Sequence, residues 1–224
     1  MISVLYEDAF IAVVNKPNGL LMHFSAIALD VEENLKQQLS LQFDKKIFLI
    51  HRLDRKTSGL VIIAFDSKSA QHIANQFVEK TIHKTYWAIC RGFMTEPKIV
   101  EKALENENGN LQDAETHFFP LKTVELEICT GKYANTRLTF VECQPKTGRT
   151  HQIRRHLAHL RHYIINDNPH GDCKVNKVFK EQLGYAHMML HAKKIIFLHP
   201  ITNEKMTLEA PIFEDFEKLL ALFP

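Results

Sequence analysis

The segment from His51 to Gly59 places one carboxylate among cations. Asp54 is flanked by Arg52, Arg55 and Lys56. Nearby positive charge favours the ionised form of a carboxyl group, so Asp54 is suited to act as a nucleophile or a base rather than as a proton donor. The same residues also fit a turn aspartate in ordinary surface ion pairs, and residue chemistry alone leaves both interpretations open.

A second concentration of charge lies between Lys146 and His162, a range without Asp or Glu. Its charged and titratable residues are Lys146, Arg149, His151, Arg154, Arg155, His156, His159, Arg161 and His162. On a chain of net charge +2, such a stripe is typical of a nucleic-acid site, although a solvated basic helix face has the same composition. His156 and His159 are three residues apart, so they could lie on one helix face and together bind a metal ion. We expect no metal, because no acidic or cysteine ligand accompanies them and the arginines would repel a cation.

Several segments, in one order along the chain, resemble the RluA family of pseudouridine synthases. His51-Arg52-Leu53-Asp54 resembles the family's H-R-L-D segment, and Lys84-Thr85-Tyr86 resembles its K-x-Y strand. Thr147–Arg154 resembles its T-G-R-x-H-Q-L/I-R segment, and Asn15–Gly19 is similar to its N-K-P-x-G turn. Together these matches span almost the whole chain.

The resemblance implies three catalytic residues. Asp54 would start cleavage of the N1–C1′ bond of uridine, by attack on the sugar, attack on the base or removal of a ribose proton. Arg154 would pair with Asp54, and Tyr86 would stack on the extruded uracil and could remove a proton from C5. Arg52 would enter the space that the flipped base leaves. The residue types alone also fit a phosphate contact for Arg154, a half-buried strand tyrosine and an ion pair for Arg52. No cofactor is needed, since uridine and pseudouridine contain the same atoms.

The resemblance also implies a structured RNA substrate. The run Arg154–His162, with His170-Gly171-Asp172, resembles a tRNA-modifying subgroup associated with uridine 65. We therefore expect tRNA as the substrate, with large-subunit rRNA as the alternative substrate. The alternative functions are an inactive RNA-binding protein and a histidine-metal phosphodiesterase. The expected RNA contacts are Arg52, His51, Arg55, Lys84, Lys146, Arg149, His151 and Arg155. Lys56, Tyr163 and Asn166 depart from the family pattern; the last stands where I-G-D is common. These departures bear on the target uridine and not on the three catalytic residues.

Apolar periodicity predicts the elements that hold these residues. The Asp54 segment lies between a short strand at 48–50 and a continuous apolar run at 60–64, which predicts a polar loop between two buried strands. The other expected strands are 2–6, 10–14, 86–90, 124–129, 137–143, 189–198 and 205–208.

The expected helices are 31–41, one capped by Asp66 or Ser67 that runs through Phe77, one within 147–162, and one from Pro211 to Leu222. The acidic stretch Glu101–Glu115 reads as a surface loop. The sum is an α+β fold with a mixed, mostly antiparallel sheet, flanking helices and a central catalytic cleft.

Length and composition limit the class of protein. The chain has 224 residues, 45% hydrophobic and 24% charged, which is the globular average. We expect one catalytic domain over 1–224, with no separate N-terminal RNA-binding domain. No export signal or run of about 18 apolar residues is present, so no membrane association is expected. The four cysteines show no CxxC spacing, which favours reduced thiols and a cytoplasmic protein. Nothing indicates a protein partner, and we expect a monomer.

Overall fold

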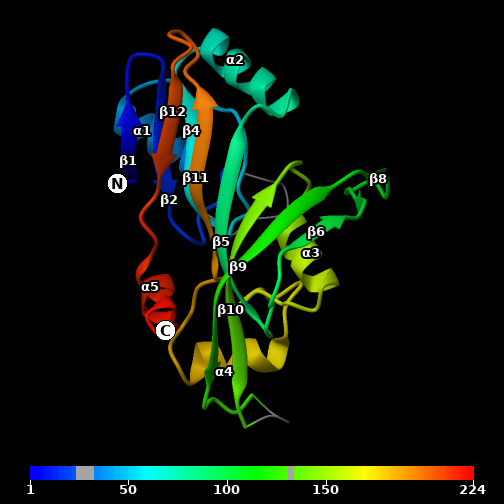
Figure 1. The fold of residues 1–224 in the computed structure, drawn as a ribbon. Coiled ribbons are helices and arrows are strands. Elements are labelled where there is room, and N and C mark those ends of the chain that lie inside the picture. The colour runs from blue at the N-terminus through cyan, green and yellow to red at the C-terminus, as the bar shows by residue number, and fades with distance from the viewer. Residues whose placement is uncertain (24–32, 131–133) are drawn as a thin grey trace. The chain divides into compact units, whose positions relative to one another are not determined.

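The computed structural model describes residues 1–23, 33–130 and 134–224 (Figure 1). The chain divides into two compact units. The first contains Met1–Lys84 and Ala192–Pro211, and the second contains Thr85–His191 and Ile212–Pro224. The chain passes between the units inside strands β5 (His83–Arg91) and β11 (Leu190–Leu198), and at the 211/212 bond.

The sheet of the first unit is built on one fully buried strand. Strand β4 (Ser58–Ala64) is buried at every position, as its continuous apolar sequence predicts. It pairs antiparallel with β2 (Ile11–Lys16), which pairs in turn with β1 (Ser3–Glu7). The short β3 (Phe48–Leu49) also pairs with β4, and β12 (Lys205–Glu209) pairs with β11. The predicted N-terminal hairpin and the loop between β3 and β4 are thus confirmed.

Two helices accompany this sheet. Helix α2 (Ser67–Val78) begins after Asp66, whose side chain accepts hydrogen bonds from the backbone N–H groups of Lys68 and Ser69, which confirms the predicted cap. Helix α1 (Leu35–Phe43) begins later than predicted. Asn34 caps it by accepting from Gln37, and the expected first residues, 31 and 32, lie outside the described residues.

The second unit has an antiparallel sheet in the order β5, β10 (Thr136–Pro145), β9 (Glu115–Leu126) and β6 (Lys98–Glu101). The predicted pairing of the strands near 124 and 137 is confirmed. The loop prediction for residues 101–115 is wrong in part, because β7 (Leu104–Glu105) and β8 (Leu111–Gln112) form a hairpin there. The Asn106 side chain closes its turn by accepting from the N–H groups of Asn108 and Asn110, a local contact that charge composition does not show.

Three helices belong to the second unit. Helix α3 (Gln152–His159) buries Ile153 and Leu157, the apolar face that its spacing predicts. Helix α4 (Cys173–Glu181), capped by Asp172, was not predicted. Helix α5 spans Glu214–Leu220, so the prediction that the last helix begins at Pro211 is wrong: its N-cap is Phe213, which has extended backbone. The α+β class is confirmed.

No helix in the described part of the chain is long and apolar enough to cross a membrane. None of the four cysteines, all of which lie in the described part of the chain, forms a disulfide bond. Cys90 and Cys143 are buried, and burial raises the pKa of the Cys90 thiol to about 12. A thiol with so high a pKa is protonated and unreactive at neutral pH.

Candidate active site

Asp54 occupies the loop between β3 and β4, within the first unit. Its side chain is half-buried, whereas the neighbouring Leu53 and Thr57 are buried. The backbone N–H of Thr57 donates to the Asp54 carbonyl at 3.0 Å, which closes a turn around the carboxylate. Arg52, on the same loop, is exposed. The loop therefore presents Asp54 and Arg52 from a backbone fixed at both ends by strands.

The turn at residues 15–19 is fastened to this loop. Gly19 N–H donates to the Arg55 carbonyl at 2.9 Å, and Arg55 Nε donates to the Gly19 carbonyl at 3.0 Å. The Asn18 side-chain amide donates to the Lys56 carbonyl. Gly19 has a φ of +85°, a conformation that favours glycine. The turn that is similar to the family's N-K-P-x-G segment thus positions the Asp54 loop.

Lys16 is a site residue that sequence reasoning missed. It is fully buried, and its Nζ donates to the carbonyls of Pro17 at 2.9 Å, Leu20 at 2.8 Å and Arg55 at 3.0 Å. Burial lowers the pKa of Lys16 to about 7, while the negative charge of Asp54 acts in the opposite direction. In the sequence, Lys16 is marked only by its position at the end of an apolar run and within the Asn15–Gly19 turn. A buried ammonium therefore both ties the turn to the loop and attracts the Asp54 carboxylate.

His51 and Lys84 flank the Phe77 ring. The His51 ring centroid lies 4.9 Å from that of Phe77, and Lys84 Nζ lies 5.9 Å from the Phe77 centroid. His51 Nε2 accepts a hydrogen bond from the Ile62 N–H at 2.9 Å, so this nitrogen carries no proton. Burial, with the positive charge of Lys84 second, lowers the pKa of His51 to about 3. Burial also lowers the pKa of Lys84 to about 8. His51 thus anchors the loop to β4, and its contact with RNA stays a prediction.

The neutral His51 ring makes the protein sensitive to acid. Because the folded-state pKa is below the unfolded value of 6.5, the unfolded chain binds the extra proton first, and the stability from neutral His51 is lost as pH falls from 6.5 toward 3. We expect His51→Gln to remove part of the acid destabilisation, up to about 3 kcal/mol between pH 7 and 4. Urea unfolding at both pH values measures this. His83→Gln, at an exposed histidine, is the control, and equal acid sensitivity in the two variants would contradict the prediction.

Arg154 lies in the second unit, where it forms a buried ion pair with Asp167. Its Nε donates to Oδ2 and its Nη2 to Oδ1, both at 2.8 Å. The two side chains are only 4% and 1% exposed. Sequence reasoning did not identify Asp167, whose partner is 13 residues away. The expected pairing of Arg154 with Asp54 joins residues of different units and stays a prediction.

The start of α3 is organised by Gln152. Its Oε1 accepts from Thr147 Oγ1 at 2.7 Å and from Arg149 N–H at 3.0 Å. Its Nε2 donates to the Glu115 carbonyl and to Thr116 Oγ1, both at 2.9 Å. The amide oxygen thus accepts two hydrogen bonds and the amide nitrogen donates two, which is the full capacity of a glutamine side chain. This buried side chain therefore joins α3 to β9.

The cations of the predicted basic stripe have different environments. Lys146 and Arg161 are exposed. Arg149 Nε donates to the Asp113 carbonyl at 2.9 Å, and Arg155 Nη1 donates to the Glu105 carbonyl at 2.8 Å. The stripe is therefore not one solvated face, because part of it holds the segment around β7 and β8.

The histidines of the stripe are also engaged. His156 Nδ1 lies 2.9 Å from Thr116 Oγ1, and its Nε2 lies 3.0 Å from the Lys102 carbonyl. His159 Nδ1 lies 3.1 Å from Lys102 Nζ. His151, with a φ of +55°, places Nδ1 at 2.9 Å from His170 Nε2. Both ring nitrogens of His156 already have partners, so a shared metal site with His159 would require those contacts to break.

Tyr86 lies on β5, opposite Cys143 of β10. Its side chain is half-buried and packs against the core of the second unit. Asp54, Arg52, His51, Arg55 and Lys84 belong to the first unit, whereas the other predicted site residues belong to the second. The latter are Tyr86, Lys146, Arg149, His151, Arg154 and Arg155.

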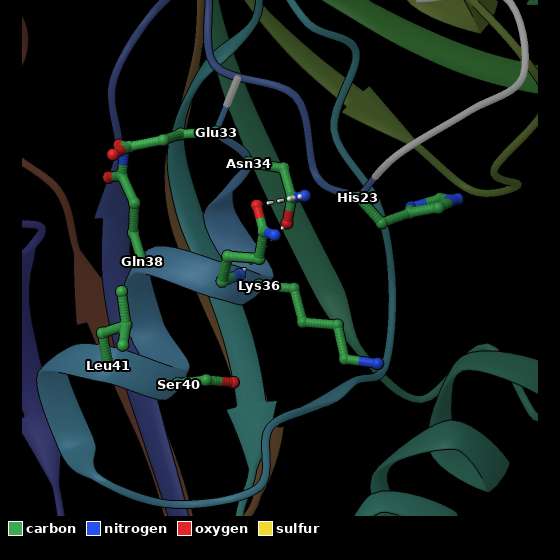
Figure 2. A pocket seen from close by; sticks show the side chains of 8 residues that line it. His23, Glu33, Asn34, Lys36, Gln38, Ser40 and Leu41 are labelled. Atoms are coloured by element: carbon green, nitrogen blue, oxygen red, sulfur yellow. Dashed lines mark hydrogen bonds between the residues drawn. The ribbon is translucent and has the colours of Figure 1, made fainter. Parts of the chain in front are cut away.

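A hollow beside α1 is a separate feature of the first unit (Figure 2). It is lined by His23, Glu33, Asn34, Lys36, Gln37, Gln38, Ser40 and Leu41. None of the predicted site residues is among them, and His23 and Glu33 flank residues that the structure does not describe.

The chain is similar to known proteins over its full length. Residues 11–159 match the sequence model of the family described as RNA pseudouridylate synthase. The chain is 39% identical to tRNA pseudouridine synthase C of Vibrio cholerae over 234 aligned positions, covering 100% of the chain and 96% of the relative. It is 37% identical to the protein of that name from Salmonella typhi, covering 100% and 90%. Among solved structures, Human RNA Pseudouridylate Synthase Domain Containing 1 has a TM-score of 0.75 at 24% identity, covering 100% of this chain and 88% of the other, which supports the fold.

Proposed function

Because the chain belongs to the RNA pseudouridylate synthase family, we propose that it isomerises uridine to pseudouridine in tRNA, with Asp54 as the nucleophile or base. The observation that carries the assignment of Asp54 is the fastening of its loop by Lys16, Asn18 and Gly19. The names of the similar proteins support tRNA, and the resemblance of residues 154–162 supports uridine 65.

The reaction is balanced within one nucleotide. The N1–C1′ bond of uridine breaks, a C5–C1′ bond forms, C5 loses a proton and N1 gains one. This balance requires no oxidant or reductant, and in our proposal positioning and one carboxylate supply the catalysis. Tyr86 would stack on the detached uracil and remove the C5 proton.

The target base must first leave the RNA stack, which costs a few kcal/mol. Arg52 would fill the space that the base leaves. Its exposure on the Asp54 loop is compatible with this role, because a buried arginine could not enter the RNA. Arg154 would pair with Asp54 through the donors that Asp167 does not use. We further propose that the protein is a cytoplasmic monomer, and sedimentation of the purified protein measures its oligomeric state.

Pseudouridine mapping tests the substrate. In total RNA from a strain lacking this protein, we expect loss of one tRNA site, and its return on expression of the wild-type protein. A lost site in large-subunit rRNA with tRNA intact would exclude the tRNA assignment. Unchanged tRNA and rRNA would favour an RNA-binding protein without this activity.

Binding to tRNA should weaken as the salt concentration rises. Lysine and arginine side chains that contact phosphates displace counterions from the RNA, and added salt opposes this release. Lys146 is exposed at the start of the basic stripe. We expect Lys146→Gln to reduce the slope of log affinity against log salt by about 1. Lys205→Gln, an equal charge change at an exposed residue of β12, is the control. An unchanged slope for Lys146→Gln would exclude a phosphate contact at this residue.

A further inference from the structure

We propose that Asp167 is a positioning residue for catalysis, which holds the Arg154 guanidinium in a single orientation. The inference rests on the proposed function, because it assigns Asp167 a role through Arg154. Asp167 uses both carboxylate oxygens on the Nε and Nη2 edge of Arg154. Two parallel bonds between planar groups fix the rotation of the guanidinium as well as its place, and the three remaining N–H donors then have a defined direction.

Asp167 is itself held from several sides. Its N–H donates to the Ile164 carbonyl at 3.2 Å, and the Asn176 side-chain amide donates to its carbonyl at 2.9 Å. Asn176 Oδ1 also accepts from the Asn166 N–H at 2.8 Å. Helix α4 therefore supports the backbone of Asp167 through one buried amide.

Asn166, which precedes Asp167, and Gly171, which follows it by four residues, both suit the local backbone. Asn166 has a φ of +63°, a conformation that asparagine and glycine tolerate better than other residues. This explains how Asn166 can stand at a position where the resemblance leads one to expect glycine. A Cβ at Gly171 would lie 2.0 Å from the Asp167 carbonyl oxygen, so the chain must pass close to Asp167 without a side chain.

A buried ion pair is a weak source of net stability. Desolvation of two charges can exceed their attraction, and apolar residues of similar size often replace buried ion pairs without loss. Arg154 and Asp167 are almost completely shielded from water, which is the setting where this cost is large. A fixed guanidinium is useful for catalysis, because a misplacement of about 1 Å can cost on the order of 100-fold in rate.

The test compares Asp167→Asn with two controls. Glu125→Gln removes a carboxylate from the exposed pair with Arg137, and Leu219→Ala leaves a core cavity in α5 with Asp167 intact. We expect Asp167→Asn to lower the single-turnover rate at saturating tRNA on the order of 100-fold, with tRNA affinity unchanged. We expect Asp167→Glu to recover part of the rate, because it keeps the charge but displaces it by one methylene. Both controls should keep the wild-type rate per folded molecule.

A second measurement does not depend on activity. In NMR spectra the Nε–H of Arg154, assigned by its loss in Arg154→Lys, should exchange slowly in the wild type and rapidly in Asp167→Asn. This comparison can also be made with Asp167→Glu if Asp167→Asn does not fold. A wild-type rate in Asp167→Asn, a loss no greater than that of Leu219→Ala, or a loss of tRNA affinity alone would overturn the inference. Absence of pseudouridine formation by the wild type would instead contradict the proposed function, while the exchange of Arg154 would still report on its positioning.

Discussion

Asp54→Asn should abolish pseudouridine formation while leaving tRNA binding close to that of the wild type. The substitution keeps the size of the side chain but removes its negative charge, so it can act neither as a nucleophile nor as a base. We expect the single-turnover rate to fall by a factor on the order of 10⁴ or more. Release of tritium from C5-labelled uridine in tRNA, with filter binding of the same RNA, measures both properties.

Asp44→Asn is the matched control for this experiment. Asp44 is exposed and has a φ of +49°, a conformation that asparagine also adopts. The control should therefore keep the wild-type rate and stability. Measurable turnover by Asp54→Asn would remove Asp54 from the chemical step, and loss of binding together with rate would show that it acts in RNA recognition.

Gly59→Ala should have the largest effect on folding. Gly59 has a φ of +108°, and a Cβ there would lie 2.3 Å from the carbonyl oxygen and 2.7 Å from the nitrogen of Ala192. Backbone atoms of a neighbouring strand cannot move aside as a flexible side chain can. We expect a loss of at least about 4 kcal/mol in the free energy of unfolding, a large part of the stability of a typical domain. Urea denaturation measures this loss.

Two other glycines separate the causes of that loss. Gly109 has a φ of +79° but no atom within 4 Å of a built Cβ, so Gly109→Ala reports backbone strain alone, about 1–2 kcal/mol. Gly148 also has open space and no such φ, and Gly148→Ala should be nearly neutral. If Gly59→Ala cost no more than Gly109→Ala, the close approach of Ala192 would not matter for folding.

Local signals predicted most elements of this protein correctly. The apolar run of β4 and the cap of α2 depend on residues that are neighbours in sequence, and both were confirmed. Helix α4 was missed, because its apolar positions are few and its sequence is rich in lysine. The start of α5 was misplaced, since Pro211 fits a first helical turn but precedes an extended segment.

Two residues that hold the Asp54 loop in place were harder to interpret. His51 belongs to the H-R-L-D segment and was expected to contact RNA, and its Nε2 accepts a hydrogen bond from the Ile62 N–H. Lys16 was noted only as part of a turn, yet it is buried against three carbonyls. In each case the role depends on a contact that neither periodicity nor composition reveals.

The sequence by itself determined the family, the Asp54 segment and most strands and helices, because these depend on residue types at short and regular spacings. Only the tertiary structure showed that Lys16 fastens the Asp54 loop and that Asp167 forms an ion pair with Arg154. It also showed that Gly59 lies against Ala192, a contact between segments far apart in the chain. Such contacts depend on strand register and on the path of the chain. The residue type at one position therefore does not reveal which distant group will contact it.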